Sequence, residues 1–79
     1  MIPIDEFIRI RREAGYNYTL DTIIHYYNIY LKFHYYRSKG EVIMQCYTNC
    51  SIECFTSERS VIKAVKLWDI IRKNNHLNI

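Results

Sequence analysis

The sequence predicts an α+β fold, with an N-terminal helix, a three-stranded antiparallel sheet and a C-terminal helix in a single domain over residues 1–79. Three observations lead to this prediction. Apolar residues recur at helical spacing near both ends of the chain. The middle of the chain is rich in Tyr, Ile and Phe, which favour strands. Two short runs of turn-forming residues, at 38–40 and 49–50, divide that middle part into three segments.

The first helix is expected over residues 3–14. Pro3 suits the first turn of a helix, and Gly15 suits its end. Acidic residues at positions 5 and 6 favour the positive end of the helix dipole. One face is apolar and carries Ile4, Phe7, Ile8, Ile10 and Ala14. Arg11 falls within this face, so we expect its side chain to reach the edge of the face or to pair with a carboxylate.

The first strand is expected over residues 27–37, where side chains alternate between two faces. One face carries Ile29, Leu31, Phe33 and Tyr35, and the other carries Tyr30, Lys32, His34 and Tyr36. The same stretch also fits helical spacing, so one long helix over residues 19–38 is the competing interpretation.

The other two strands are expected over residues 41–47 and 51–55, joined as a hairpin around Asn49 and Cys50. This pairing places Cys46 and Cys54 on the core face and Cys50 at the loop tip, where it would be the more reactive thiol. The tight Cys-x2-Cys pair of structural zinc sites is missing, although His25, His34 and His76 offer further ligands. We therefore expect plain thiols, with no metal and no cofactor.

The second helix is expected over residues 57–73, with Ser57 as its cap and Glu58 at the positive end of its dipole. Its apolar face carries Val61, Ala64, Val65, Leu67, Trp68 and Ile71. The core of the protein is expected to contain Phe7, Ile29, Val61, Val65 and Trp68.

Composition narrows the classes of function. The net charge is only +3, from eleven Lys and Arg against eight Asp and Glu. No phosphate-binding glycine loop, acid pair or catalytic triad order is present, which favours a protein that is not an enzyme. Acidic residues replace the basic region of an export signal, so we expect a cytoplasmic location; no apolar run predicts a membrane span. Abundant Ile, Tyr, Asn and Lys suggest an A/T-rich genome, such as that of a low-GC bacterium, one of its phages or some DNA viruses.

Two groups of residues are candidate contacts for a partner. The first is the face of the expected strand that carries Tyr30, Lys32, His34 and Tyr36, with Arg37 beside it. Exposed tyrosines interleaved with cations bind proteins or stack on nucleic-acid bases, whereas a covering helix would make them part of the core. The second group is the basic row Arg59, Lys63 and Lys66 on the C-terminal helix, which is either a solvated face or a binding surface.

In size, composition and element order, the whole chain resembles the small inhibitors made by phages and mobile elements, including anti-CRISPR proteins. That resemblance implies steric blocking of a host protein, such as a nuclease or a nucleoprotein complex, in the host cytoplasm. A DNA- or RNA-binding regulatory module is the alternative. The element order also resembles the double-stranded-RNA-binding domain, but Ser57-Glu58-Arg59-Ser60 stands where that domain has its lysine cluster. A homodimer formed through the tyrosines is compatible with each of these functions.

Overall fold

The computed structural model describes residues 2–14 and 18–75, and all regular structure within these ranges is helical. The four helices are α1 (Ile4–Ala14), α2 (Leu20–Ser38), α3 (Ile43–Glu53) and α4 (Glu58–Asn75). The predicted α+β fold is therefore wrong. The helices expected at the two ends are present, but α2 and α3 take the place of the three-stranded sheet.

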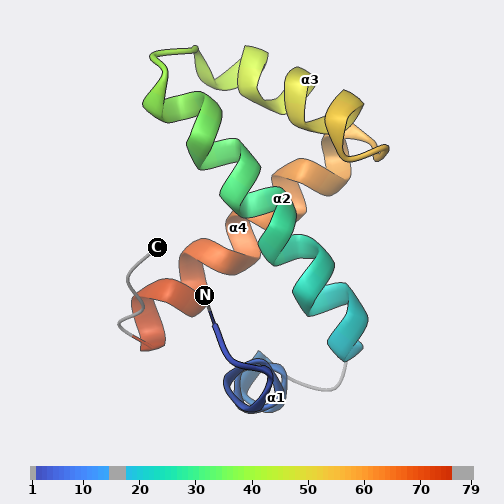
Figure 1. The fold of residues 1–79 in the computed structure, drawn as a ribbon, viewed down its shortest axis with the longest axis vertical. Coiled ribbons are helices and arrows are strands. Elements are labelled where there is room, and N and C mark those ends of the chain that lie inside the picture. Colours follow the sequence, from blue (N-terminus) through green and yellow to red (C-terminus); the bar gives the residue numbers. More distant parts are fainter. Residues whose placement is uncertain (1, 15–17, 76–79) are drawn as a thin grey trace.

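The arrangement is a crossed pair of helices with a further helix at each end (Figure 1). The long helices α2 and α4 cross near their middles and pack against each other. Helix α3 lies across one end of this pair and contacts both α2 and α4, whereas α1 packs against α2 at the other end. Helix α2 therefore touches all three of the others.

Helix α2 confirms the competing interpretation of one long helix and excludes the strand over 27–37. The Thr19 side chain caps its start by accepting a hydrogen bond from the Thr22 backbone N–H at 3.1 Å. Because three helices surround α2, apolar residues occur on most of its sides. In a short stretch, that distribution also produces the alternation that predicted a strand.

Helix α3 replaces the hairpin predicted over 41–47 and 51–55. Cys46 and Cys50, four residues apart, are both fully buried on the inner side of this helix. Their small side chains allow α3 to approach α2 and α4 closely, and strand propensity is a weak preference that such packing overrides. The predicted pairing of Cys46 with Cys54 across a hairpin is thus wrong, and so is the loop-tip position of Cys50.

The core confirms the five residues predicted from the sequence: Phe7, Ile29, Val61, Val65 and Trp68 are all buried. Trp68 on α4 is the point where three helices meet. Its indole Nε1–H donates to the carbonyl of Ile23 on α2 at 3.2 Å. Its ring lies 6.1 Å from that of Phe7 on α1 and 4.7 Å from that of Tyr27 on α2, measured between ring centroids.

Two local features, the Ser57 cap and the position of Arg11, can be compared with their predictions. The Ser57 hydroxyl caps α4 by accepting from the Ser60 backbone N–H at 3.1 Å, as predicted. The Arg11 side chain is half-buried and donates from Nε to the carbonyl of Tyr18 at 3.0 Å. Arg11 thus binds a backbone oxygen at the start of α2, where the sequence predicted an edge position or a carboxylate partner.

Candidate functional site

The residues predicted to form one exposed face are divided between two helix contacts, because α2 turns by about 100° per residue. Tyr30 and His34, four residues apart, lie toward α4. Tyr30 is fully buried, and its hydroxyl donates to Asp69 Oδ1 at 2.7 Å. Burial and this hydrogen bond raise the pKa of Tyr30. The half-buried imidazole of His34 lies 4.4 Å from the Tyr30 ring, between ring centroids.

Lys32 and Tyr36, also four residues apart, reach helix α3. Both contact the carboxylate of Glu53, with Lys32 Nζ 3.4 Å from Oε1 and the Tyr36 hydroxyl donating to Oε2. The hydrogen bond to Glu53 raises the pKa of Tyr36 to about 12 and lowers the pKa of Glu53. Arg37 donates from Nη1 to the carbonyl of Glu41 at 2.8 Å. Lys32 and Tyr36 therefore join α2 to α3, while Arg37 binds the turn between the two helices.

Tyr30 thus belongs to the core and Tyr36 to a contact between two helices, which was one of the interpretations left open by the sequence, whereas Tyr35 is 48% exposed. Tyr30 in particular offers no free surface to a partner while α2 and α4 remain packed. The exposed sheet face is a wrong prediction, because the fold has no sheet to carry it within the described residues.

The basic row of α4 lies where the sequence predicted it. The side chains of Arg59, Lys63 and Lys66 are exposed. No carboxylate of the described residues forms an ion pair with any of the three. Lys63 and Lys66 line a pocket of about 330 Å³ between α4 and the start of α2. The complete lining is Tyr18, Tyr26, Lys63, Lys66, Leu67 and Ile70.

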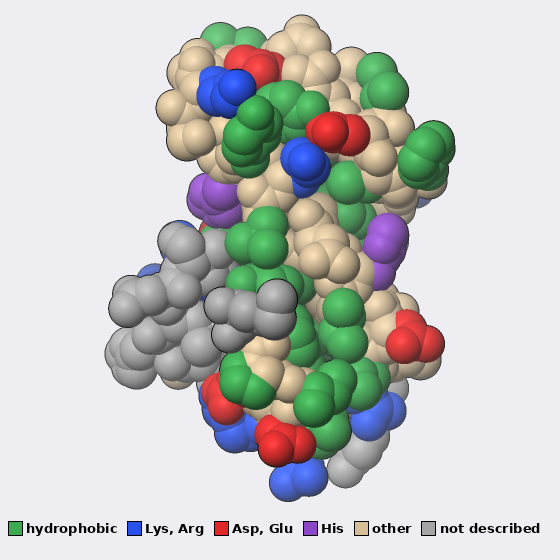
Figure 2. Space-filling model, in the orientation of Figure 1, with side chains coloured by type: hydrophobic (Ala, Val, Ile, Leu, Met, Phe, Trp, Pro, Cys, Tyr) green, Lys and Arg blue, Asp and Glu red, His purple; other side chains and the backbone are tan. Residues whose placement is uncertain are grey.

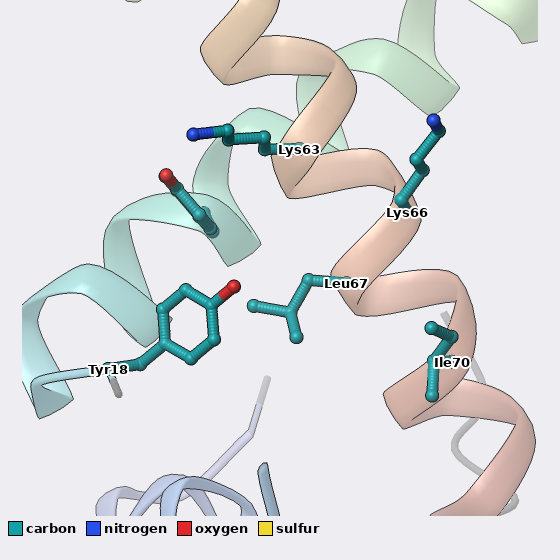
Figure 3. Close-up of a pocket in the computed structure, with 6 residues that line it drawn as sticks. Tyr18, Lys63, Lys66, Leu67 and Ile70 are labelled. Atoms are coloured by element: carbon teal, nitrogen blue, oxygen red, sulfur yellow. The ribbon is translucent and has the colours of Figure 1, made fainter. Parts of the chain in front are cut away.

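Figure 3 shows how the pocket is built. Tyr18 reaches from the start of α2 toward Leu67 on α4, and Lys63 and Lys66 leave α4 on different sides. The rings of Tyr18 and Tyr26 lie 6.3 Å apart, between centroids, in an edge-to-face contact. The pocket thus combines two phenol rings, an apolar floor and two ammonium groups, with no acidic residue in its lining. Sequence reasoning did not connect either tyrosine with the lysines, since only the packing of α2 against α4 brings them together.

A second surface, on the outer side of α3, was also missed. Three large apolar residues are exposed there: Met44 at 69%, Ile52 at 69% and Phe55 at 96%. Hydrophobic side chains reach the surface over α3, at the top of the view in Figure 2. Met44 and Ile52 are eight residues apart on one side of α3, and Phe55 follows the end of the helix. A helical interpretation of this segment would have placed Met44 and Ile52 together.

The cysteines do not form a reactive or metal-binding group in this arrangement. Burial raises the pKa of Cys50 to about 12, so its thiol stays protonated at neutral pH. Burial also raises the pKa of Cys46 and of the half-buried Cys54. Within residues 2–14 and 18–75, no three His, Cys, Asp or Glu side chains are placed to hold a metal ion. His76, considered as a ligand, lies outside the described residues.

Comparisons with protein-family models, curated proteins and solved structures found no match for this chain. None of the described helices has both the length and the apolar content needed to cross a membrane.

Proposed function

We propose that the protein is a non-enzymatic inhibitor or adaptor that binds a partner protein through the outer side of α3 and blocks it sterically. The observation that carries this proposal is Phe55. Its ring is 96% exposed, and its backbone has a φ of +52°, in the left-handed region that favours glycine.

Helices α2 and α3 end in the same way, and a comparison of the two ends shows that phenylalanine is unusual at position 55. Helix α2 ends with Gly40 at a φ of +87°, and the Gly40 and Glu41 N–H groups donate to the last carbonyls of the helix. Helix α3 ends in the same motif, with hydrogen bonds from Phe55 and Thr56 to the carbonyls of Ile52 and Ser51. Glycine is the usual residue at this position. Phe55 therefore carries a backbone cost and gains almost no packing in return.

A protein partner would account for both properties of Phe55. Aromatic residues are enriched among the few side chains that dominate binding between proteins. Met44 and Ile52 extend the apolar surface along the same side of α3. Exposed apolar groups gathered on one element in this way mark interaction sites more often than isolated ones do.

Charge indicates what kind of partner fits. Residues 41–58 hold three Glu and no Lys or Arg, while the rest of the chain holds all eleven basic residues and five acidic ones. The segment that forms α3 and its flanking turns is thus acidic, although Lys32, Arg37 and Lys39 at the neighbouring end of α2 add positive charge beside it. Complementary potentials steer association and favour the right partner. A basic surface with an apolar centre, such as the nucleic-acid groove of a nuclease, has the required chemistry.

The test compares Phe55→Gly with wild-type protein. Glycine keeps the helix end and removes the ring, so the free energy of unfolding should stay within about 1 kcal/mol of wild type. The control is Ile4→Ala, which removes an exposed apolar side chain from α1. Tagged versions of all three proteins are incubated with nuclease-treated host lysate and washed at high salt.

We expect one stoichiometric protein to be retained by wild type and by Ile4→Ala and to be lost with Phe55→Gly. Adding the wild-type protein to that purified partner should then inhibit it, and Phe55→Gly should not. Retention of the same proteins by all three versions would contradict the proposal, and so would a complex that leaves the partner fully active.

A further inference from the structure

We propose that the pocket between α4 and the start of α2 binds single-stranded nucleic acid, with a base against Tyr18 and Tyr26 and the phosphate backbone along the basic side of α4. This site lies on different helices from the α3 surface and does not depend on the function proposed for that surface. Three features support this site: the residues that line the pocket, the spacing of the cations and the absence of acids from the lining.

The lining offers the two kinds of group that a nucleotide requires. A base is flat and apolar on its faces, and proteins hold unpaired bases by stacking them on aromatic rings. Tyr18 and Tyr26 are half-buried, so each ring is partly open to the pocket. Leu67 and Ile70 supply apolar contacts. The volume of about 330 Å³ lies at the lower end of the range for ligand sites, roughly 300–1,000 Å³.

Lys63 and Lys66 supply the charge for the phosphates. They are three residues apart on α4, and their side chains extend from the helix in different directions beside the pocket (Figure 3). Arg11 on α1 donates to the Tyr18 carbonyl at 3.0 Å, which fixes the backbone just before α2. An anion that enters the pocket meets the positive charge of Lys63 and Lys66.

The row of cations favours a strand over a free nucleotide. Arg59, Lys63, Lys66 and Lys73 follow one another at intervals of three, four or seven residues, which is one side of a helix. The row from residue 59 to residue 73 is about 21 Å long, at 1.5 Å per residue. A single nucleotide contacts only the cations beside the pocket, whereas a strand contacts the whole row. Duplex bases are stacked inside the helix and cannot reach Tyr18.

The experiment measures fluorescence anisotropy of a short labelled oligothymidylate with the full chain, at salt concentrations between roughly 50 and 200 mM. The double variant Lys63→Gln/Lys66→Gln removes two phosphate contacts. It should flatten the slope of log K against log salt by about 1.4, since each contact on a single strand contributes about 0.7. Lys39→Gln is the control, because it removes an exposed lysine at the α3 end and should leave the slope unchanged.

Variants of Tyr18 test the contribution of stacking separately from that of charge. Tyr18→Leu should weaken binding by roughly tenfold, while Tyr18→Phe, which keeps the ring, should bind within about twofold of wild type. Circular dichroism confirms that each variant is folded. The proposal is overturned by any of three results: no binding at the lowest salt, a slope that the double variant leaves unchanged, or equally tight binding of the duplex of the same sequence. Thymidine monophosphate that displaces the strand at equal nucleotide concentration would show a free-nucleotide site and would also overturn it.

Discussion

His34 shows how a single side chain responds to the helices around it. The imidazole is half-buried against the rings of Tyr30 and Phe33, and no described residue provides a hydrogen-bond partner for Nε2. Burial lowers the pKa of His34, the positive charge of Arg72 lowers it further, and Asp69 opposes this effect. The folded protein therefore favours the neutral imidazole.

A loss of stability in mild acid should follow. The pKa of His34 in the folded state lies below the ordinary value of 6.5, so below that pH the unfolded chain binds more protons and the free energy of unfolding falls. Carboxylates whose pKa is lowered in the folded state, such as Glu53, reduce the stability only below their ordinary pKa of 4.5. Melting temperatures measured from pH 7.5 down to about pH 5 should therefore decrease in wild type.

His34→Gln should remove most of this pH dependence, whatever its effect on the melting temperature itself. His25→Gln, a change at an exposed histidine, is the control and should retain the wild-type slope. The same slope in all three proteins would show that His34 is not the group responsible.

At the scale of the elements, the ends of α2 and α3 determine where the chain turns. Each end needs one residue with a positive φ, so that two backbone N–H groups can reach the last carbonyls of the helix. Gly40 meets this need without strain, and Phe55 meets it with strain. The region around a Cβ built on Gly40 is empty, with no heavy atom within 4 Å. Any penalty for substitution there comes from the backbone alone.

Gly40→Ala should lower the free energy of unfolding by about 1–2 kcal/mol, which is the cost of the left-handed conformation for a residue with a Cβ. Urea denaturation followed by circular dichroism measures this change. Gly40→Asn is the matched control and should cost less, since asparagine tolerates that conformation better. Equal midpoints for wild type and Gly40→Ala would disprove the backbone explanation.

At the scale of the whole molecule, Trp68 joins α1, α2 and α4 through its contacts with Phe7, Ile23 and Tyr27. Helix α3 is held to the same group by the buried thiols of Cys46 and Cys50. The outer side of α3 and the basic side of α4 are thus two surfaces on one packed unit. Small single domains packed in this way unfold in one cooperative step.

One transition should therefore be seen by every probe. Trp68 is the only tryptophan in the chain, so its fluorescence reports on the junction of three helices, while far-ultraviolet circular dichroism reports on all helices together. Urea titrations followed by both signals should give the same midpoint. A circular dichroism change that precedes the fluorescence change would show that a helix, such as α3, unfolds independently.

The sequence predicted the core residues better than it predicted the candidate sites. The five core residues were predicted correctly. Phe7, Val61 and Val65 lie at helical spacing, Trp68 is the sole tryptophan, and Ile29 was assigned to the core from the apolar face of the strand that α2 replaces. Lys63 and Lys66 were found from one helix alone. Tyr18 and Tyr26 were not, because a pocket between two helices depends on packing that no local pattern records.

The sequence by itself determined the two terminal helices, the Ser57 cap, the core residues and the basic side of α4, because spacing and capping are local properties. Only the tertiary structure decided between helix and strand over residues 20–53. Tyr, Ile and Cys favour strands when considered alone, but α2 is covered by three helices and α3 places two small thiols against α2 and α4. A helix is recognised from an apolar pattern on one side, and burial of α2 on several sides removes that pattern. Tyr30 therefore resembled a surface residue until the packing of α2 against α4 placed it in the core.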